Sequence, residues 1–456
     1  MDRKRFLYTT ALGVPGLAFF PALLASCKKE SPFDEPAFKG RVAIIGAGAS
    51  GLYAAYLLAE RGISATVFEA SDKIGGRIAT DNSFSTHKLN LGAEFIHGER
   101  SAWYDLARYQ NAVFLEPALK SYVHINGQTT REDAASGIAD YVSASAAFDD
   151  ISTYDGADVP ASAYGNVMGL SEEGHALFNA WVGNENGTDN SRIGMAGLAQ
   201  ADQAWTAGLR DFKITNTDML GLLQSAFANV AGNVILNTPI QLVDYSDNEV
   251  VLTDTDGNTY TFDRVIVTSS IKVLFDSLIE FTPTLPPLHL QAINTLGMDT
   301  GIKMFLKFST AFWPSDLGSI AGPGPVPEFW TNTDVFTDEH ILTAFINGGK
   351  AEDLLALGTD MIPAILAQLD TYFDNQASPT FLSYTLKNWA EEPYVRGAYS
   401  YAKPGMALET RTLLHEPVAN KVYFAGEATH DGGHHGTVHG AMETAARAVA
   451  KLLTTA

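Results

Sequence analysis

Three glycines and one acid near the start of the chain have the types and spacing of a dinucleotide-binding turn. Gly46, Gly48 and Gly51 follow directly after a short apolar stretch. In such a turn the first glycine allows a tight bend, the second lets the backbone approach a pyrophosphate, and the third lets a helix pack on the sheet. Glu69 follows at close to the usual spacing of about 20 residues, where a carboxylate accepts hydrogen bonds from a ribose. The sequence predicts three elements that position these residues: a strand over 41–45, a helix over 52–61 and a strand over 64–68.

A second glycine pair indicates which dinucleotide the turn takes. Gly75 and Gly76 are followed by Arg77, shortly after the acid. This arrangement resembles the extended FAD fingerprint of the glutathione-reductase-like flavoproteins, in which the arginine lies by the FAD phosphates. An ordinary Gly-Gly turn beside a solvated arginine is the alternative. Because the pair follows the first motif, it favours FAD over NAD.

Four later stretches are similar to segments of the flavin-containing amine oxidases, the monoamine and polyamine oxidase superfamily. In order along the chain they are residues 91–98, 236–268, 387–399 and 424–441. The resemblance implies that the first stretch wraps the flavin, that Ile240 offers its backbone to the adenine, and that Glu427 bonds the ribityl or phosphate region. Together the turns and the resemblance imply these cofactor-binding residues: Gly46, Gly48, Gly51, Glu69, Ala70, Gly76, Arg77, Gly92, Ala93, Glu94, Ile240, Trp389, Gly426, Glu427 and Val438.

The end of the last stretch also predicts a helix from its composition. Residues 438–453 are rich in alanine and follow a glycine-containing loop. A helix start of this kind presents free N–H groups. These groups would face the pyrimidine end of the flavin ring, where reduced flavin gathers negative charge.

Lys303 is the candidate catalytic residue of the middle of the chain. Alternation within residues 301–308 puts Lys303, Phe305 and Lys307 on one face of a strand. A solvated strand edge with two lysines is one interpretation. The resemblance implies another, because in the family this segment carries one buried lysine that holds a water against flavin N5. Lys303 matches that position and Lys307 does not.

Four further positions bear on the substrate and on how the flavin is held. Tyr399 matches one of two rings that steer an amine toward the flavin, and is predicted as a catalytic residue. Thr437 occupies the place of the second ring, so half of this aromatic cage is missing. Ala398 stands where monoamine oxidases tether the flavin through a cysteine, which predicts non-covalent FAD. His97 matches a position near the substrate in polyamine-type relatives, with a packed, hydrogen-bonded histidine as the alternative.

Composition excludes several other classes of protein. The chain has 52 Asp and Glu against 30 Lys and Arg, a formal net charge of −22, so a basic surface for nucleic acid is excluded. One cysteine allows no intrachain disulfide framework and no Cys-rich metal site. Four histidines gather near the C-terminus, but we predict no metal site because no third ligand has a fixed offset: His430, His434, His435 and His439.

The first residues predict export and a lipid anchor. Three basic residues precede an apolar run over residues 6–25, which prolines and glycines interrupt, as suits a signal peptide. The run ends in a sequence that looks like a bacterial lipobox, with the single cysteine, Cys27, at the lipidated position. A chance cysteine after a simple signal is the alternative. The sequence thus predicts a lipoprotein signal over 1–26, a tether over 27–39 and a place in the bacterial cell envelope; Sec and twin-arginine export both stay open.

The predicted fold is α/β, with a Rossmann-like FAD domain and a mixed-sheet α+β substrate domain, as in the two-domain amine oxidase fold. We expect the FAD domain at 40–100, 215–290 and 392–456, and the substrate domain at 101–214 and 291–391. The resemblance implies oxidation of an amine C–N bond by hydride transfer to flavin N5. A small amine would be the substrate, and oxygen or a redox protein the electron acceptor. Two alternatives stay open: another FAD oxidoreductase of this fold (an amino-acid oxidase, a desaturase or a protoporphyrinogen-type enzyme), and a tethered non-catalytic FAD-binding protein.

Overall fold

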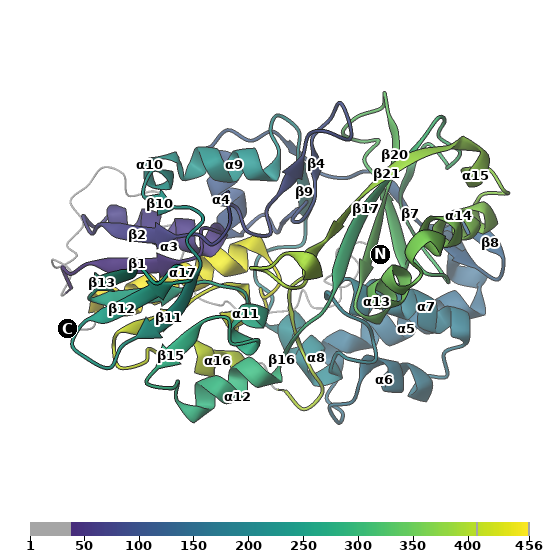
Figure 1. Cartoon of the computed structure of the whole chain (residues 1–456). Coiled ribbons are helices and arrows are strands. Elements are labelled where there is room, and N and C mark those ends of the chain that lie inside the picture. The colour runs from purple at the N-terminus through teal and green to yellow at the C-terminus, as the bar shows by residue number, and fades with distance from the viewer. Residues whose placement is uncertain (1–37, 407–408, 455–456) are drawn as a thin grey trace.

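A parallel sheet of five strands forms the centre of one half of the molecule (Figure 1). Each neighbouring pair of its strands runs parallel. The strand order is β10 (Val234–Ile235), β2 (Ala65–Phe68), β1 (Val42–Ile45), β14 (Arg264–Val267) and β23 (Val422–Phe424). In this computed structural model, residues 38–406 and 409–454 are described. The predicted signal, most of the predicted tether and Cys27 lie outside the described residues.

The two faces of this sheet are covered by different layers. Along β1, Val42 and Ile44 pack into a core with helices α3 (Ala49–Ala59) and α17 (Val438–Thr454). Ala43 and Ile45 pack on the opposite side, as expected from the two-residue period of a strand. That side is covered by a second sheet of strands β13 (Thr259–Phe262), β12 (Val250–Asp254), β11 (Ile240–Asp244) and β15 (Glu280–Thr282). The strand, helix and strand predicted around the glycine turn are therefore all present.

A mixed sheet of seven strands builds the other half of the molecule. Its order is β21 (Phe381–Asn388), β17 (Gly301–Phe308), β20 (His340–Asn347), β19 (Glu328–Thr331), β18 (Leu317–Ala321), β7 (Lys120–Ile125) and β8 (Gln128–Arg131). Strands β18 and β7 run parallel, and the other pairs run antiparallel. Helices pack against this sheet: α5 (Ala139–Asp149), α6 (Ala161–Val167), α7 (Glu172–Asn179), α8 (Met195–Gln203), α13 (Gly349–Ala356) and α14 (Met361–Tyr372).

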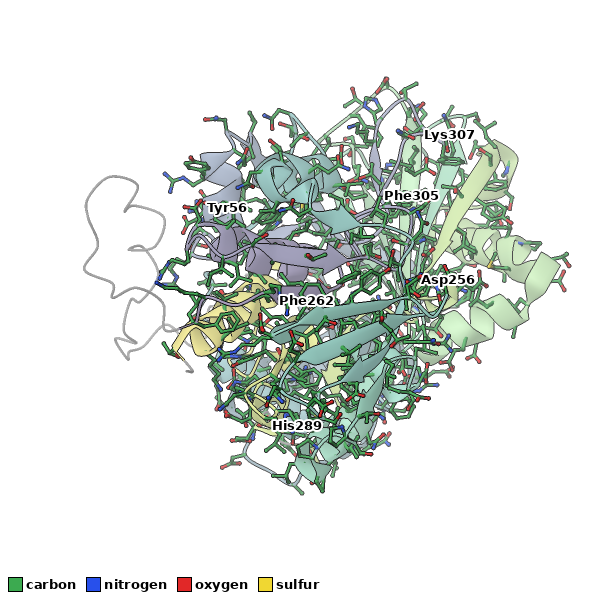
Figure 2. All side chains as sticks on the ribbon, turned by 60° about the vertical axis from the view of Figure 1, so that its left-hand side comes forward. Tyr56, Asp256, Phe262, His289, Phe305 and Lys307 are labelled. Carbon is green, nitrogen blue, oxygen red and sulfur yellow. The ribbon has the colours of Figure 1, made fainter. Side chains whose placement is uncertain are left out.

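Strand β17 is an interior strand, paired on both sides with β20 and β21. Its residues Ile302, Met304 and Leu306 pack into the core under α13 and α14. The alternate residues, of which Figure 2 labels Phe305 and Lys307, face the other side. The predicted alternation along this strand is thus confirmed, but the strand has no solvated edge.

Segments far apart in the sequence share each sheet. Strand β7 pairs with β18, and β14 pairs with β1 and with β23, so the chain crosses repeatedly between the two halves. This confirms the predicted α/β fold of two interleaved parts. The residue boundaries of the two domains stay a prediction. Helix α4 (Ala102–Tyr109) packs beside α17 in the core that α3 also shares, although the predicted range 101–214 placed it with the substrate domain.

Shorter elements complete the described chain. The remaining strands are β3 (Thr80–Asp81), β4 (Leu89–Asn90), β5 (Ile96–His97), β6 (Phe114–Leu115), β9 (Asp211–Ile214), β16 (Leu296–Met298) and β22 (Ser400–Ala402). The remaining α-helices are α9 (Met219–Ala226), α10 (Ala228–Ala231), α11 (Ile271–Phe275), α12 (Pro287–Thr295), α15 (Ala377–Thr380) and α16 (Thr410–Leu414). Within the described residues, no helix has the length and apolar character needed to cross a bilayer.

Candidate active site

The turn between β1 and α3 has a separate steric reason for each glycine. Gly46 has a φ of +106°, which side-chain-bearing residues rarely adopt. A Cβ atom on Gly51 would stand 1.9 Å from the carbonyl oxygen of Gly46, so the helix can approach the turn only with glycine there. A Cβ on Gly48 would have no protein atom nearer than 3.9 Å, and Gly48 instead lines a cavity. No side chain caps α3, so its first N–H groups are left for a ligand in that cavity.

Two cavities join into one elongated site along the end of the parallel sheet. Both are lined by Gly46, Glu69, Ser269 and Tyr394, so they adjoin one another. One, of about 590 Å³, extends from these residues to Ile240. The other, of about 250 Å³, extends to the strand β17. The predicted site residues that line one or both are Gly46, Gly48, Glu69, Ala70, Gly76, Arg77, Gly92, Ala93, Ile240, Lys303, Trp389, Tyr399, Gly426, Glu427, Thr437 and Val438.

Glu69 is held in place by the turn itself. Its Oε2 accepts a hydrogen bond of 2.7 Å from the backbone N–H of Ala47. Its Oε1 accepts from the backbone N–H of Ser71 at 2.9 Å and from the hydroxyl of Ser71 at 2.8 Å. A carboxylate has about four acceptor sites, so the predicted ribose contact would use the lone pairs that remain.

Glu427 ties together three segments that line the cavity. It forms an ion pair of 2.9 Å with Arg77, accepts from the Ser400 hydroxyl at 2.7 Å, and accepts from the backbone N–H of Gly436 at 2.8 Å. Burial opposes the charge, but Arg77 and Arg411 hold the pKa of Glu427 below its usual range. These three contacts join the segments of Arg77, Ser400 and Gly436. The structural role of Glu427 is therefore to fix the wall of the cavity, beside any bond to the cofactor's ribityl or phosphate region that the resemblance implies.

Lys303 is buried in the wall of the cavity. Its side chain is 3% exposed, and its Nζ donates to the carboxylate of Glu94 and to the carbonyl of Gly92, the latter at 3.3 Å. The ring of Trp330 lies 5.7 Å from this nitrogen. Burial lowers the pKa of Lys303, and the Glu94 carboxylate opposes that shift. The alternative of a solvated strand edge is wrong for this lysine, because β17 is paired on both sides.

Tyr399 and Thr437 line the same end of the cavity. The Tyr399 hydroxyl donates to the carbonyl of Glu185 at 2.7 Å, which fixes the ring. The Thr437 hydroxyl donates to the His434 carbonyl at 2.7 Å and accepts from the backbone N–H of Gly440 at 3.0 Å. Thr437 therefore caps the start of α17 as well as lining the cavity. Helix α17 points its N-terminus at the cavity, as predicted, because Val438 also lines it.

Three predicted site residues do not line these two cavities. Gly51 packs behind the turn. Glu94 lies behind Lys303 and lines a separate cavity. His97 on β5 pairs with Asp211 through its Nδ1 at 2.7 Å, and its ring lies 6.1 Å from that of Phe95. These contacts agree with the packed, hydrogen-bonded alternative for His97, and its predicted substrate contact stays a prediction.

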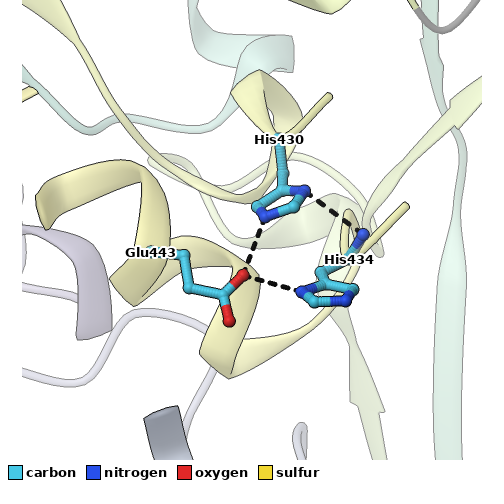
Figure 3. A group of neighbouring side chains, drawn as sticks. All are labelled: His430, His434 and Glu443. Atoms are coloured by element: carbon cyan, nitrogen blue, oxygen red, sulfur yellow. Dashed lines mark hydrogen bonds and ion pairs between the residues drawn. The ribbon is translucent and has the colours of Figure 1, made fainter. Parts of the chain in front are cut away.

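A compact group of two histidines and one glutamate lies at the start of the C-terminal helix (Figure 3). Glu443 Oε2 lies 2.8 Å from Nε2 of His430 and 2.7 Å from Nδ1 of His434. The other ring nitrogens accept from backbone N–H groups: that of His430 from Gly432 at 3.1 Å, and that of His434 from Thr206 at 3.1 Å. The nitrogens facing Glu443 must then carry the protons in neutral rings. A metal-bound histidine normally donates its other N–H to an acceptor, so these contacts favour a hydrogen-bonded clamp over a metal site.

Several residues that line the site were not predicted from the sequence. Phe345 and Asn347 on β20 line the cavity because β20 pairs with β17, which sets Phe345 opposite Lys303. Thr268 and Ser269 line it because they directly follow β14. The last two could have been found, since residues after the carboxyl ends of parallel strands gather at one edge of a sheet.

The residues of the elongated cavity fit FAD. The cavity runs from Ile240 past the glycine turn to Lys303, which is the shape that an extended dinucleotide needs. A Cβ on Gly48 would take up part of this space without meeting the protein. The N-termini of α3 and α17 supply N–H groups at two points of the cavity. The single cysteine of the chain, Cys27, lies outside the described residues, and Ala398 lines the cavity where the resemblance placed a tethering cysteine.

Comparisons with known proteins agree with this geometry. Residues 170–453, more than half of the chain, match the family described as flavin containing amine oxidoreductase. Residues 44–109 match the NAD(P)-binding Rossmann-like domain. Probable polyamine oxidase 4 of Arabidopsis thaliana is 28% identical over 443 residues, which cover 88% of this chain and 84% of that protein. Lysine-specific histone demethylase 2 of Homo sapiens is 27% identical over 85% of this chain, which spans only 50% of that protein's length.

Solved structures show the same fold. A putrescine oxidase bound to putrescine superposes with a TM-score of 0.79 at 21% identity, over 92% of this chain and 100% of that chain. Cyclohexylamine oxidase from Brevibacterium oxydans gives a TM-score of 0.76 at 20% identity, over 91% of this chain and 99% of that chain. The chain belongs to the flavin-containing amine oxidoreductase family, with FAD held without a covalent bond as its cofactor.

Proposed function

We propose that this protein oxidises a C–N bond of a small amine to an imine, which water then hydrolyses to a carbonyl compound. The observation that carries the proposal is the buried Lys303 at the end of the cavity that Tyr399 and Thr437 also line. Bound FAD supplies the acceptor for the two electrons and the hydrogen that leave the amine carbon. Oxygen or a redox protein then takes the electrons.

The residues around that end of the cavity suit an uncharged amine. The ring of Tyr399 gives one apolar wall for the approach to the flavin. Loss of a hydride from the amine carbon needs the free lone pair of the nitrogen, which an ammonium group lacks. The substrate therefore reacts as the neutral amine, and Lys303 holds a water or a proton at the flavin side. Thr437 leaves the opposite wall open, so we expect a bulky or secondary amine to fit better than a slim arylalkylamine.

An amino-acid substrate is less well supported by the cavity. An amino-acid oxidase needs a cation for the substrate carboxylate, usually an arginine. Among the residues lining the first cavity the arginine is Arg77, whose Nη1 is bonded to Glu427 and to the carbonyl of Ala398 at 2.9 Å each. Because this guanidinium already bonds residues of the cavity wall, it is not available for a substrate carboxylate. This favours an amine without a carboxylate as the substrate.

Anaerobic mixing with a panel of substrates tests the proposal. The panel contains slim and bulky primary amines, secondary amines and amino acids, and the readout is loss of the yellow flavin absorbance. We expect bleaching by at least one amine and none by amino acids. Bleaching by amino acids alone would support the amino-acid oxidase alternative. If no compound of the panel bleaches the flavin while dithionite does, the protein is a non-catalytic FAD-binding protein.

We further propose that the enzyme works at the bacterial cell envelope, on the periplasmic or outer face, attached through a lipid on Cys27. The lipobox-like sequence before Cys27 and the polar stretch after it support this proposal. The membrane would be reached through this anchor alone. The anchor would leave the folded enzyme in the aqueous phase at the end of the tether.

A further inference from the structure

A separate polar cavity, called the second cavity below, lies behind Lys303. The cavity that Lys303 itself lines is called the flavin cavity. The second cavity has a volume of about 330 Å³ and is lined by Glu94, Lys213, Asn216, Asp218 and Asn332, among others. Because one water takes up about 30 Å³ in the liquid, this space can hold several waters on polar partners. Glu94 lines this cavity but not the flavin cavity, whereas Lys303 lines the flavin cavity but not this one. The ion pair of the two residues is therefore the wall between the cavities.

This pair is the direct polar connection between the two cavities. The side chains of Lys303 and Glu94 are 3% and 8% exposed, and Nζ of the lysine donates straight to the carboxylate. Burial lowers the pKa of Lys303, so its proton is easier to release than that of a lysine in water. Other charged groups near the pair already have partners of their own in the described chain: Lys213 with Asp334, Lys88 with Asp218, His87 with Asp338, and Lys387 with Glu392.

The reaction of this family requires a proton at the flavin side. Two electrons and one proton convert FAD to its reduced anion. The reduced anion, oxygen and one proton then give FAD and hydrogen peroxide. An amine brings its hydrogen to the flavin as part of the hydride, so with an amine the outside proton is needed for reoxidation, whereas a donor of electrons alone needs one for reduction as well. The side chain of Lys303 is 3% exposed, so a titratable group in contact with it is the direct source of a proton there.

We propose that Glu94 relays protons between Lys303 and the water-accessible cavity beside Lys213. In each transfer Lys303 gives its proton toward the flavin side and takes one from the Glu94 carboxyl, which is recharged from water in the second cavity. Glu94 acts through Lys303, so it is a positioning and relay residue and does not itself touch the substrate. The inference rests on the FAD-dependent chemistry proposed above, but not on the identity of the amine.

The test follows proton uptake directly and needs neither amine nor oxygen. The holoenzyme is mixed anaerobically with reduced methyl viologen, a donor of electrons without protons, in the presence of a pH-indicator dye. In the wild type, dye and flavin signals should change together. In Glu94→Gln, which keeps the shape but cannot carry a proton, proton uptake should lag behind flavin reduction by about 10²-fold. The lag should shrink as the pH falls, and Glu94→Asp should restore most of the wild-type rate.

A matched control is available on the same strand. Lys307 on β17 pairs with Glu339 at 2.9 Å, and neither residue lines the flavin cavity. Glu339→Gln makes the same chemical change and should leave proton uptake as in the wild type. Val335→Trp narrows the second cavity and leaves Lys303 and Glu94 unchanged, so it should slow proton uptake. This variant tests the relay even if Glu94→Gln fails to bind flavin. The relay is overturned if proton uptake keeps pace with flavin reduction in Glu94→Gln or in Val335→Trp. It is also overturned if proton uptake in Glu339→Gln lags as much as in Glu94→Gln.

Discussion

The chemistry of single residues in this site depends on charges that are buried in pairs. Lys303 and Glu94 neutralise one another, and so do Arg77 and Glu427. Removing one partner of such a pair leaves an uncompensated buried charge, which costs more than the pair itself contributes. The effect of a substitution at these residues on stability must therefore be measured separately from its effect on the reaction.

Replacement of Lys303 by methionine should slow flavin reoxidation by oxygen. The change keeps the length and removes the charge that stabilises a developing anion, and we expect a decrease of ~10²-fold or more. It also leaves Glu94 buried alone, at a cost of about 3–5 kcal/mol unless the carboxyl takes a proton. The double variant Lys303→Met with Glu94→Gln removes that cost, so stopped-flow reoxidation of both variants separates the two effects. Reoxidation at the wild-type rate in the double variant would assign Lys303 a structural role only.

Replacement of Thr437 by tyrosine should rebuild the second wall of the cage. Preference should shift toward slim primary amines by ~1–3 kcal/mol in relative kcat/KM. The hydroxyl of Thr437 also caps α17, so the variant should lose about 1 kcal/mol of stability. Thr437→Ser keeps the cap without adding a ring, and its preference should match the wild type. Equal kcat/KM ratios for a bulky and a slim amine in Thr437→Tyr and wild type would show that position 437 does not face the substrate.

The sequence identified most residues of this site but not the contacts among them. Lys303 was found because the strand alternation and the family segment coincide on it. Its partner Glu94 lies far away in the sequence, in the loop before β5, so their contact depends on tertiary packing that no local pattern encodes. The same reason explains His97, whose neighbour Asp211 comes from a strand paired only in the folded chain.

At the scale of elements, the glycine turn between β1 and α3 was fully predictable because each glycine has a local steric role. The start of α3 at Ala49, three residues before the predicted start, reflects a turn that runs straight into the helix. The pairing of β7 with β18 was not predictable, because a parallel pair between distant segments has no sequence signature of its own.

Gly48 and Gly51 should respond to substitution in opposite ways. Gly48→Val should give a folded apoprotein without flavin, since Gly48 has an ordinary φ of −78° and its Cβ would meet only the space of the cofactor. Gly51→Val should unfold the domain, since its Cβ would overlap the Gly46 carbonyl. Circular dichroism and the flavin-to-protein absorbance ratio distinguish the two outcomes. An unfolded Gly48→Val would contradict the steric argument.

The clamp of His430, His434 and Glu443 should make stability depend on pH. Burial lowers the pKa of His430 below its ordinary value of 6.5, so below that pH the unfolded chain binds more protons than the folded one. Stability should therefore fall as the pH drops from about 7 to 5, by at most about 1.4 kcal/mol per pH unit for this group. His430→Gln keeps a donor for Glu443 and should reduce the Tm difference between pH 7 and pH 5. An unchanged Tm difference in His430→Gln would show that this clamp does not set the pH dependence.

For the whole molecule, the negative net charge opposes binding to an anionic membrane surface. The chain carries a formal net charge of −22, so it is repelled by the anionic surface of a membrane and cannot bind there through charge. Its described helices offer no membrane span. We propose that the lipid on Cys27 supplies the attachment.

Replacement of Cys27 by serine should release the enzyme from membranes. Two acyl chains give lasting attachment, because each buried CH₂ contributes about 0.8 kcal/mol, whereas a single chain gives only reversible binding. The wild type should thus stay in the membrane pellet at high salt, and Cys27→Ser should move to the soluble fraction with its flavin content unchanged. We expect amine oxidation to stay unchanged as well, so the activity in each fraction is the measurement. If Cys27→Ser still pellets and resists high salt, another part of the chain attaches it.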